Sequence, residues 1–332
     1  MNGVNSMSYS LRSTAISVLL VLLGGCATAP VMQDIENLPA DSGLVFGSAE
    51  IYVNDEKLDL GFSWSGENHF YLLILPPDSS VATTYEVTDE GTFYWPLPPG
   101  EYLLLGYRWQ QAGTARSGDI RASFTVPEIG ADAYIGSLEF RGTEYALKPN
   151  LLDRYDQQKA IHDERFPERA KTTIESLMQP PEQPGNYTAM LPACHPRFAI
   201  ECGERFRGIT PTSPEVTTSG FPGVRTLQPE FTWQGSVNTS IHYDLILYEA
   251  ATYTINQVTD FYARGRLAAY VEDISATSWR PDKPLKPDTR YFWSVRSRDG
   301  EVVSSWSTQS YFSFAIVAWS SGYGQWFQFQ TP

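Results

Sequence analysis

Groups that carry enzyme chemistry are scarce in this sequence of 332 residues. It has three cysteines, Cys26, Cys194 and Cys202, and four histidines, no two of which form an H-x-x-x-H pair. Neither a G-x-S-x-G nucleophile elbow nor a phosphate-binding P-loop occurs. Carboxylates are common, but those within residues 153–164 belong to a charged stretch, as on a solvated helix face. We therefore expect no catalytic residue, no metal site, no cofactor and no enzymatic activity.

Positive charge is also scarce. The chain has 24 Lys and Arg against 38 Asp and Glu, and its formal net charge is −14. Because like charges repel, phosphate backbones and anionic membrane surfaces are unfavourable partners, and we expect no binding to nucleic acid. The aromatic content of 14%, together with frequent Gly and Pro, favours β-sandwich domains, and the length favours two of them.

The apolar run near the N-terminus is too short to span a bilayer. It covers only residues 15–23, whereas a membrane-spanning helix needs about 20 residues. Arg12 precedes the run, and Gly24 and Gly25 end it. A basic start, a short apolar region and small residues at a cleavage site are typical of a secretory signal.

The stretch LGGC, ending at Cys26, resembles the lipobox of bacterial lipoprotein signals. The resemblance implies that residues 1–25 are a signal peptide and that Cys26 is lipidated, so that the membrane is a partner. Two or more acyl chains anchor a protein stably where one does not. Ala27 implies, by the sorting rule of that family, the outer membrane, and we expect the protein to face the periplasm. The alternative is a short buried helix in which Cys26 only packs.

Lipidation of Cys26 would leave Cys194 and Cys202. In an oxidising compartment an even remainder favours a disulfide, which would close the loop CHPRFAIEC and stabilise the fold by about 2–3 kcal/mol. The rival interpretation is a metal site formed by the two cysteines and His195. That site lacks a fourth ligand and a C-x-x-C spacing.

Residues 26–43 predict a polar, lipidated tether, and residues 44–147 predict a first domain of short strands. The run HFYLLILPP has no polar alternation, which indicates a strand buried on both faces. In TFYWPLPPGEYLLLGYRW, Pro98, Pro99 and Gly100 predict a turn between two strands. This turn and the later AYIGSLEF are similar to the transthyretin-like and carboxypeptidase-regulatory group of β-sandwiches. That resemblance implies an accessory module without chemistry of its own.

Residues 148–224 predict a helical connector followed by the cysteine loop and a linker. Apolar residues recur at helical spacing in NLLDRYDQQKAIHDERFPERAKTTIESLMQ, and Pro167 suits the first turn of a second helix. TPTSPEVTTSGFPG predicts the linker. We expect these helices to pack as a connector rather than to act in catalysis or docking.

Residues 225–332 resemble a fibronectin type III domain. Trp233 lies on an early predicted strand, as the buried tryptophan of that family does, and LKPDTRY resembles its turn into a tyrosine corner at Tyr291. In YFWSVRSRDG, Trp293 and Arg296 fall on opposite faces of a half-buried strand. The fold class expected for the whole chain is mostly β, with two Ig-like or fibronectin-like β-sandwiches joined by a short helical connector.

Two stretches depart from a plain fibronectin domain. Residues 251–275 are long for the middle of this fold, and DFYARGRLAAY within them is compatible with a short helix. Residues 308–326 are rich in aromatics. The candidate interface residues are Tyr311, Phe312, Trp319, Tyr323 and Trp326. Exposed aromatic patches mark interfaces with proteins or sugars, while the alternative is that these side chains cover an enlarged core.

These patterns predict a non-enzymatic lipoprotein of the cell envelope that presents a surface to an envelope protein. The lipobox and two folds common in interaction modules support this interpretation. A carbohydrate-binding lipoprotein is the alternative, and an unrecognised hydrolase is the least favoured. Fold alone does not decide among these functions.

Overall fold

The computed structural model describes most of the chain beyond the predicted tether. The described residues are 41–63, 66–111, 114–126, 130–144, 146–169, 173–180, 184–191, 206, 209–216, 220–235, 240–255, 258–315 and 318–332. The signal segment, Cys26, Cys194, His195 and Cys202 lie outside them.

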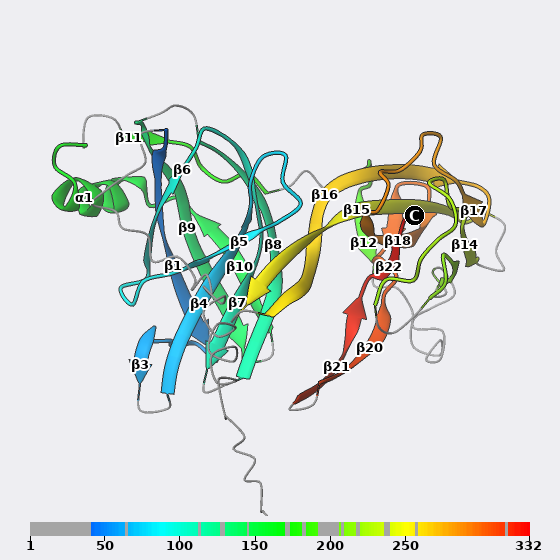
Figure 1. Ribbon diagram of the computed structural model, residues 1–332, viewed down its shortest axis with the longest axis horizontal. Coiled ribbons are helices and arrows are strands. Elements are labelled where there is room, and N and C mark those ends of the chain that lie inside the picture. Colours follow the sequence, from blue (N-terminus) through cyan, green and yellow to red (C-terminus); the bar gives the residue numbers. More distant parts are fainter. Residues whose placement is uncertain are drawn as a thin grey trace, which may run out of the picture.

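The described part of the chain is mostly β, in two sandwiches that lie side by side (Figure 1). This confirms the predicted fold class. Its one helix is α1 (Tyr155–Arg165), and no helix there is long and apolar enough to cross a membrane.

The first sandwich consists of two facing sheets. One sheet has the order β10-β9-β1-β2, with β6 beside β1 and β11 beside β9; the other has the order β3-β4-β7-β8, with β5 beside β4. The strands of the first sheet are β1 (Gly43–Val53), β2 (Glu56–Lys57), β6 (Thr92–Leu97), β9 (Asp132–Thr143), β10 (Ala146–Leu152) and β11 (Thr173–Glu175). Those of the second are β3 (Gly61–Ser63), β4 (Gly66–Leu75), β5 (Thr83–Glu86), β7 (Gly100–Gln111) and β8 (Thr114–Val126).

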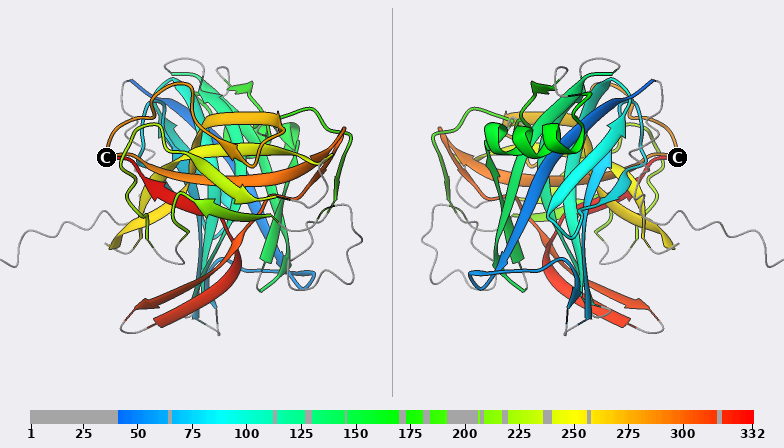
Figure 2. Two further views of the ribbon diagram at one scale, coloured as in Figure 1. Left: turned by 90° about the vertical axis from the view of Figure 1, so that its right-hand side faces the viewer. Right: turned by 90° about the vertical axis from the view of Figure 1, so that its left-hand side faces the viewer.

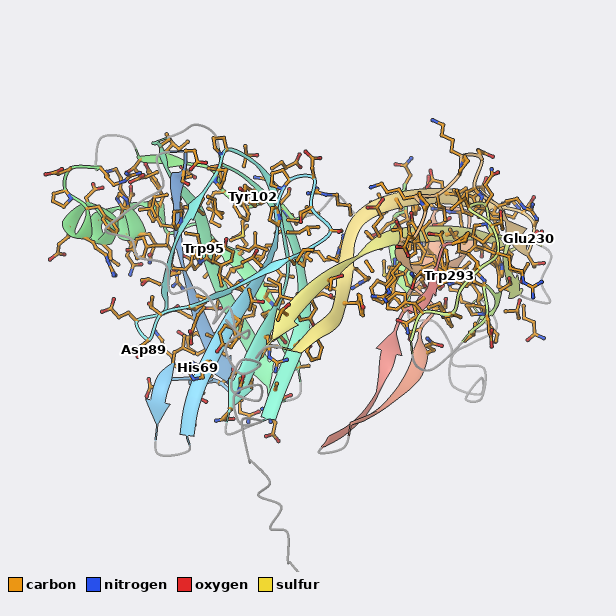
Figure 3. The ribbon with its side chains drawn as sticks, viewed as in Figure 1. His69, Asp89, Trp95, Tyr102, Glu230 and Trp293 are labelled. Atoms are coloured by element: carbon orange, nitrogen blue, oxygen red, sulfur yellow. The ribbon has the colours of Figure 1, made fainter. Side chains whose placement is uncertain are left out.

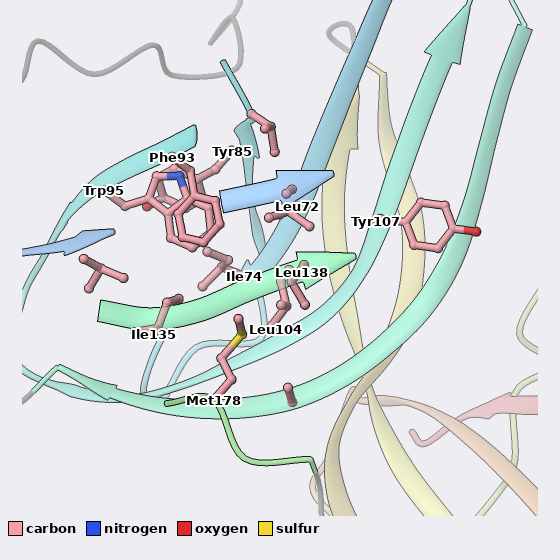
Figure 4. Close-up of a cluster of buried hydrophobic side chains, with 14 of the residues drawn as sticks. Leu72, Ile74, Tyr85, Phe93, Trp95, Leu104, Tyr107, Ile135, Leu138 and Met178 are labelled. Carbon is pink, nitrogen blue, oxygen red and sulfur yellow. The ribbon is translucent and has the colours of Figure 1, made fainter. Parts of the chain in front are cut away.

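The core of the first sandwich is aromatic and aliphatic (Figure 4). The rings of Phe93 and Trp95 stack with centroids 4.1 Å apart, and Tyr85 lies against Trp95. The predicted turn at Pro98 is present, and the buried Tyr102 hydroxyl donates to the Pro98 carbonyl over 2.9 Å. The turn joins β6 of one sheet to β7 of the other, so it is a crossover rather than a hairpin.

Strand β4 is buried on both faces, as its uninterrupted apolar run predicts. Leu72 and Ile74 face the core of the first sandwich. Leu73 and Leu75 belong instead to a separate buried cluster that includes residues of the second sandwich. The lack of alternation in this strand therefore reflects contact between the two domains.

The second sandwich pairs a three-stranded sheet with a larger one. The small sheet has the order β13-β14-β17, and the large one β12-β19-β18-β15-β16, with β22 also paired to β18. The small-sheet strands are β13 (Thr210–Ser213), β14 (Phe231–Gln234) and β17 (Ser278–Trp279). The large-sheet strands are β12 (Ala189–Leu191), β15 (His242–Ile255), β16 (Val258–Ile274), β18 (Arg290–Asp299), β19 (Val302–Ser304) and β22 (Phe327–Gln330).

The residues that suggested a fibronectin-like domain lie where that resemblance implies. Trp233 is buried and meets the Tyr243 ring edge to face. The Tyr291 hydroxyl accepts a 3.0 Å hydrogen bond from the backbone N–H of Lys286, which forms the expected tyrosine corner. Trp293 fills the centre of this core as Trp95 does in the other (Figure 3).

Residues 260–270 are not helical. They belong to β16, which pairs with β15 in a hairpin that extends beyond the second sandwich and reaches the first (Figure 1). The short helix considered for DFYARGRLAAY is therefore wrong. Pairing along β15 and contact with the first sandwich outweigh the helical spacing of this stretch.

Among the described residues of the predicted connector, only α1 is helical. The second helix, expected around Pro167, is wrong: residues 173–175 form β11, which pairs in parallel with β9, and Met178 enters the first core. The expected boundary at Leu147 falls inside β10. Strands β12 and β13 belong to the second sandwich. Apolar residues at helical spacing therefore lie in a strand at the edge of a sheet and in the first core, and not on one face of a helix.

The aromatic insertion forms a hairpin of β20 (Gln309–Ala315) and β21 (Ala318–Gln325), paired only with each other among the described strands. It projects from the second sandwich in all three directions of view (Figures 1 and 2). The chain then enters β22 through Trp326.

Candidate functional site

The outer half of the β15–β16 hairpin holds the two sandwiches together. Ala251 and Tyr253 of β15 pack against Leu73 in a buried apolar cluster. Beside it, the backbone N–H of Ala82 donates to the Thr252 carbonyl over 2.8 Å. The seam therefore combines apolar burial with backbone pairing, as within a domain.

Arg121 crosses this seam from the first sandwich. It lies at an irregularity of β8 with a φ of 56°, a left-handed conformation that costs a non-glycine residue about 1–3 kcal/mol. Its Nη1 donates to the Arg264 carbonyl over 2.7 Å and its Nη2 to the Gly265 carbonyl over 3.2 Å. The guanidinium also lies 4.2 Å from the centre of the Tyr248 ring. Backbone strain of this kind gathers at binding sites.

Arg264 of β16 crosses in the other direction. Its guanidinium forms an ion pair with Asp119 of β8 and lies 4.2 Å from the centre of the Trp326 ring. Two arginines from opposite sandwiches thus fix the seam at one point.

A cleft of about 650 Å³ opens beside the two crossing arginines. We call it the interdomain cleft. Its walls come from both sandwiches and from the chain that leads into β12. The lining residues are Asp119, Ile120, Arg121, Pro180, Pro184, Tyr187, Met190, Ile246, Tyr248, Arg264, Arg296, Trp306 and Trp326. Its size falls within the range of about 300–1,000 Å³ typical of small-ligand sites.

Arginines and aromatic rings alternate along the wall of the cleft. The Arg296 guanidinium lies 4.7 Å from the ring of Tyr187 and 4.4 Å from that of Trp306. The Trp306 and Trp326 rings are 5.9 Å apart, and Arg264 follows over Trp326. Cation–π contacts of this kind contribute about 0.5–2 kcal/mol each. Tyr187, Trp306 and Trp326 are only partly buried, so the wall is accessible.

A buried carboxylate supports this wall from behind. Asp244, with no exposed surface, accepts from Arg296 Nε over 2.8 Å and from Arg298 Nε over 2.6 Å. The hydrogen bond to Asp244 raises the pKa of Arg298 above its usual value. The Tyr270 hydroxyl donates to Asp244 over 3.2 Å, and burial, followed by the Asp244 charge, raises the pKa of Tyr270 to about 12. This network holds Arg296 in one orientation.

Arg121 differs electrostatically from its neighbours. Arg296 forms an ion pair with Asp244 and Arg264 forms one with Asp119, whereas Arg121 donates to two carbonyls and lies against a ring. Burial, the largest effect, lowers the pKa of Arg121. The group still carries its charge at neutral pH, because arginine titrates above 12.

Comparison with known proteins gives distant likenesses among solved structures. No family model matches it, and no curated protein matches it. Among solved structures it is similar to the FN1–FN3 domains of chicken CNTN1, at 9% identity over 86% of this chain and 69% of that one, with a TM-score of 0.19. A DUF3823 family protein from Parabacteroides merdae matches at 8% identity over 88% and 100% of the chains, with a TM-score of 0.18. Likeness this distant assigns neither family nor ligand.

The structure brings one of the five predicted interface residues into the cleft. Trp326 lies against Tyr248, with ring centres 5.6 Å apart. The other four lie on the backbone of β20 and β21, and their side chains are outside the described part of the structure. These four are Tyr311, Phe312, Trp319 and Tyr323. The proposed lipid site Cys26 and the proposed disulfide Cys194–Cys202 are also outside it.

The described histidines each contact a carboxylate. His162 is fully buried on α1, with Nε2 2.8 Å from Asp132, and Arg169 pairs with the same carboxylate. His69 lies 2.5 Å from Glu86, and His242 is also paired, with Asp273. Among the described residues no group of three or more His, Cys, Asp or Glu is placed to hold a metal ion.

Most of the cleft was missed by sequence reasoning. The alternation around Trp293 correctly placed Arg296 on the face opposite the core, but predicted that this face is solvated. Arg296 is instead 1% exposed, because Tyr187 and Trp306 cover it. An arginine that follows the core residues of a strand, with a tryptophan ten residues later, is the only local signal of this site.

Proposed function

We propose that the chain is a lipid-anchored binding protein of the bacterial cell envelope, without catalytic activity, and that the interdomain cleft is its ligand site. The observation that carries this proposal is the alternating wall of partly buried aromatic rings and arginines. Trp, Tyr and Arg are the residues most enriched at the energetic centres of interfaces.

The construction of the cleft favours binding over mere packing. A seam that only joins two domains needs apolar burial, which the cluster around Tyr253 supplies. The cleft adds the left-handed backbone of Arg121 and the buried Asp244 network. Both features cost folding free energy, and a role in ligand binding would account for that cost. Preorganised side chains lose little entropy when a ligand arrives.

The proposal of a lipid anchor is based on the LGGC stretch, and such an anchor would place the protein in the cell envelope. Lipidation of Cys26 would place the cleft near the membrane, within reach of the tether formed by residues 26–43. We expect Cys26→Ser to release the protein from the membrane fraction or to leave an uncleaved precursor. Normal fractionation of this variant would contradict the anchor.

A carbohydrate is a second candidate occupant beside an envelope protein. The observation that favours it is the cleft itself, because its concave shape and small volume suit a few rings rather than a broad protein surface. Aromatic faces also suit the C–H faces of sugar rings.

The binding proposal is tested by retention of the unlipidated chain, residues 27–332, on isolated envelopes that lack the endogenous copy of this protein but keep their other proteins. Trp326→Ala and Trp306→Ala should each lower retention at least tenfold, because they remove the rings of the wall. Tyr52→Ala is the matched control, since Tyr52 also stacks under an arginine, Arg141 at 4.0 Å, but far from the cleft lining. Equal losses in all three variants would contradict the assignment of the cleft.

A further inference from the structure

The interdomain cleft has a local charge opposite to that of the chain. Three guanidiniums line it, those of Arg121, Arg264 and Arg296, and Asp119 is the one carboxylate among its described lining residues. Behind Arg296, Asp244 is shared with Arg298, which also pairs with Glu272. Among these described groups four guanidiniums face three carboxylates, so one positive charge remains, on a protein whose net charge is −14. An uncompensated positive charge in a partly dry site favours the binding of an anionic group.

The arginines keep N–H groups for a ligand. Each guanidinium has five N–H donors. Arg121 directs two of them at carbonyls, Arg296 directs one at Asp244 and one at the Tyr270 hydroxyl, and Arg264 pairs with Asp119 through Nη2. Arg121 and Arg264 are neighbours in the cleft lining, and their guanidiniums lie 4.2 Å and 6.0 Å from the centre of the same Tyr248 ring. A carboxylate is the acceptor whose geometry fits a guanidinium fork.

The rings next to these donors define the rest of the ligand. Trp306 and Trp326 have partly exposed indoles with centres 5.9 Å apart, inclined at 43° to each other. They form a curved apolar wall rather than a flat slot. A saccharide presents apolar C–H faces at successive angles along its chain, with polar groups at the ring edges. Acidic membrane lipids fit less well, because the strongly negative chain is repelled by an anionic surface.

We infer that the interdomain cleft binds an acidic saccharide, with sugar rings against Trp306 and Trp326 and a sugar carboxylate at Arg121 and Arg264. This inference rests on the proposed binding function and specifies its ligand. Two sources share the chemistry: a uronic-acid polysaccharide and peptidoglycan strands whose N-acetylmuramic acid carries no stem peptide, so that its lactyl carboxylate is free.

The test is calorimetric titration of the full mature chain in detergent with defined probes. A tetrasaccharide of glucuronic acid is compared with the same tetrasaccharide after reduction of its carboxyl groups to alcohols. The disaccharide N-acetylglucosaminyl-N-acetylmuramic acid represents the second source. We expect at least one acidic probe to bind, at least tenfold more tightly than the reduced tetrasaccharide, and to weaken as salt is raised.

Variants separate the two halves of the site. Trp326→Ala should weaken the acidic and the reduced probe alike, by tenfold or more. Arg121→Gln should weaken only the acidic probe, while Arg121→Lys, which keeps the charge but loses the fork, should lie between. Arg141→Gln, at the control pair with Tyr52, should change neither. Thermal unfolding of each variant verifies that the seam has survived.

Three outcomes would overturn the inference. Equal affinity for the acidic and reduced tetrasaccharides would remove the role of the arginines. Failure of all probes, combined with retention on protein-containing envelopes that still depends on Trp326, would assign the cleft to a protein partner and leave the binding function intact. Failure of all probes together with retention that ignores Trp306 and Trp326 would reject both the ligand class and the proposed function.

Discussion

In the part of the chain that the structure describes, each sandwich buries one aspartate completely, and the two aspartates have different neighbours. Asp132 of the first sandwich contacts His162 and Arg169, and this group fastens α1 to the end of β9. Asp244 of the second contacts Arg296 and Arg298 and stands behind the interdomain cleft. Asp132, which holds a helix in place, contacts one histidine and one arginine. Asp244, which supports the wall of the cleft, contacts two arginines.

Exposure sharpens the comparison. The Arg169 side chain is 27% exposed, so water shares its charge. The Arg296 and Arg298 side chains are 1% and 7% exposed, so their charge is compensated by carboxylates, by Asp244 for both and by Glu272 for Arg298 as well. Removal of each carboxylate should therefore have unequal effects.

The largest effect is expected from Asp244→Asn. It leaves Arg296 without its counter-charge in a dry site, while Arg298 keeps its ion pair with Glu272 at 3.1 Å, and the loss costs about 3–5 kcal/mol of unfolding free energy. Urea denaturation at neutral pH measures it. Glu50→Gln is the matched control, because Glu50 also contacts two cations, Lys57 at 2.8 Å and Arg154 at 2.7 Å, but is partly exposed. That variant should lose less than about 1 kcal/mol, and equal losses would erase the distinction.

Asp132→Asn should have a smaller effect, about 1–3 kcal/mol, because the Arg169 side chain can turn toward water and the new amide can still hydrogen-bond to His162. Its signature is local. Limited proteolysis should cut within α1 faster than in the parent chain, while tryptophan fluorescence from the two cores stays unchanged. Unfolding of the second sandwich in this variant would show that the two aspartates are not independent.

The smallest effect concerns Tyr270, which belongs to the Asp244 network. Its pKa, about 12 in the folded chain, lies above the ordinary tyrosine value of 10. The neutral phenol is therefore favoured by folding, so this contribution is complete below pH 10 and is lost as the pH rises toward 12. Tyr270→Phe should flatten the loss of stability between pH 10 and 12, as measured by thermal unfolding at each pH. An unchanged slope would place the alkaline sensitivity elsewhere.

Local signals in the sequence predicted the sandwiches well. The tyrosine corner joins Tyr291 to Lys286, which is five residues earlier, and Trp233 lies within one short strand. Both motifs are local, so they can be recognised in the sequence. The apolar run of β4 even predicted burial on both faces. The sequence did not predict which element covers the second face of β4, because Ala251 and Tyr253 lie far from it along the chain.

The candidate site was largely beyond prediction for the same reason. Arg121 and Arg264 are ordinary surface arginines by sequence, and only the irregularity in β8 aims the first across the seam. Trp326 was singled out because it ends an aromatic stretch. Its partner Trp306 lies two residues before that stretch and was passed over. Residues 173–175 were assigned to a helix because their spacing fits one, while an open edge of β9 took them as a strand.

The shared β15–β16 hairpin has a consequence for how the molecule melts. Its inner half is part of the second sandwich, and its outer half covers apolar residues of the first. Loss of either sandwich would expose surface on the other. Heating should therefore produce a single calorimetric transition with the unfolding enthalpy of both sandwiches together. A ligand bound at the seam should raise the temperature of that one transition without splitting it.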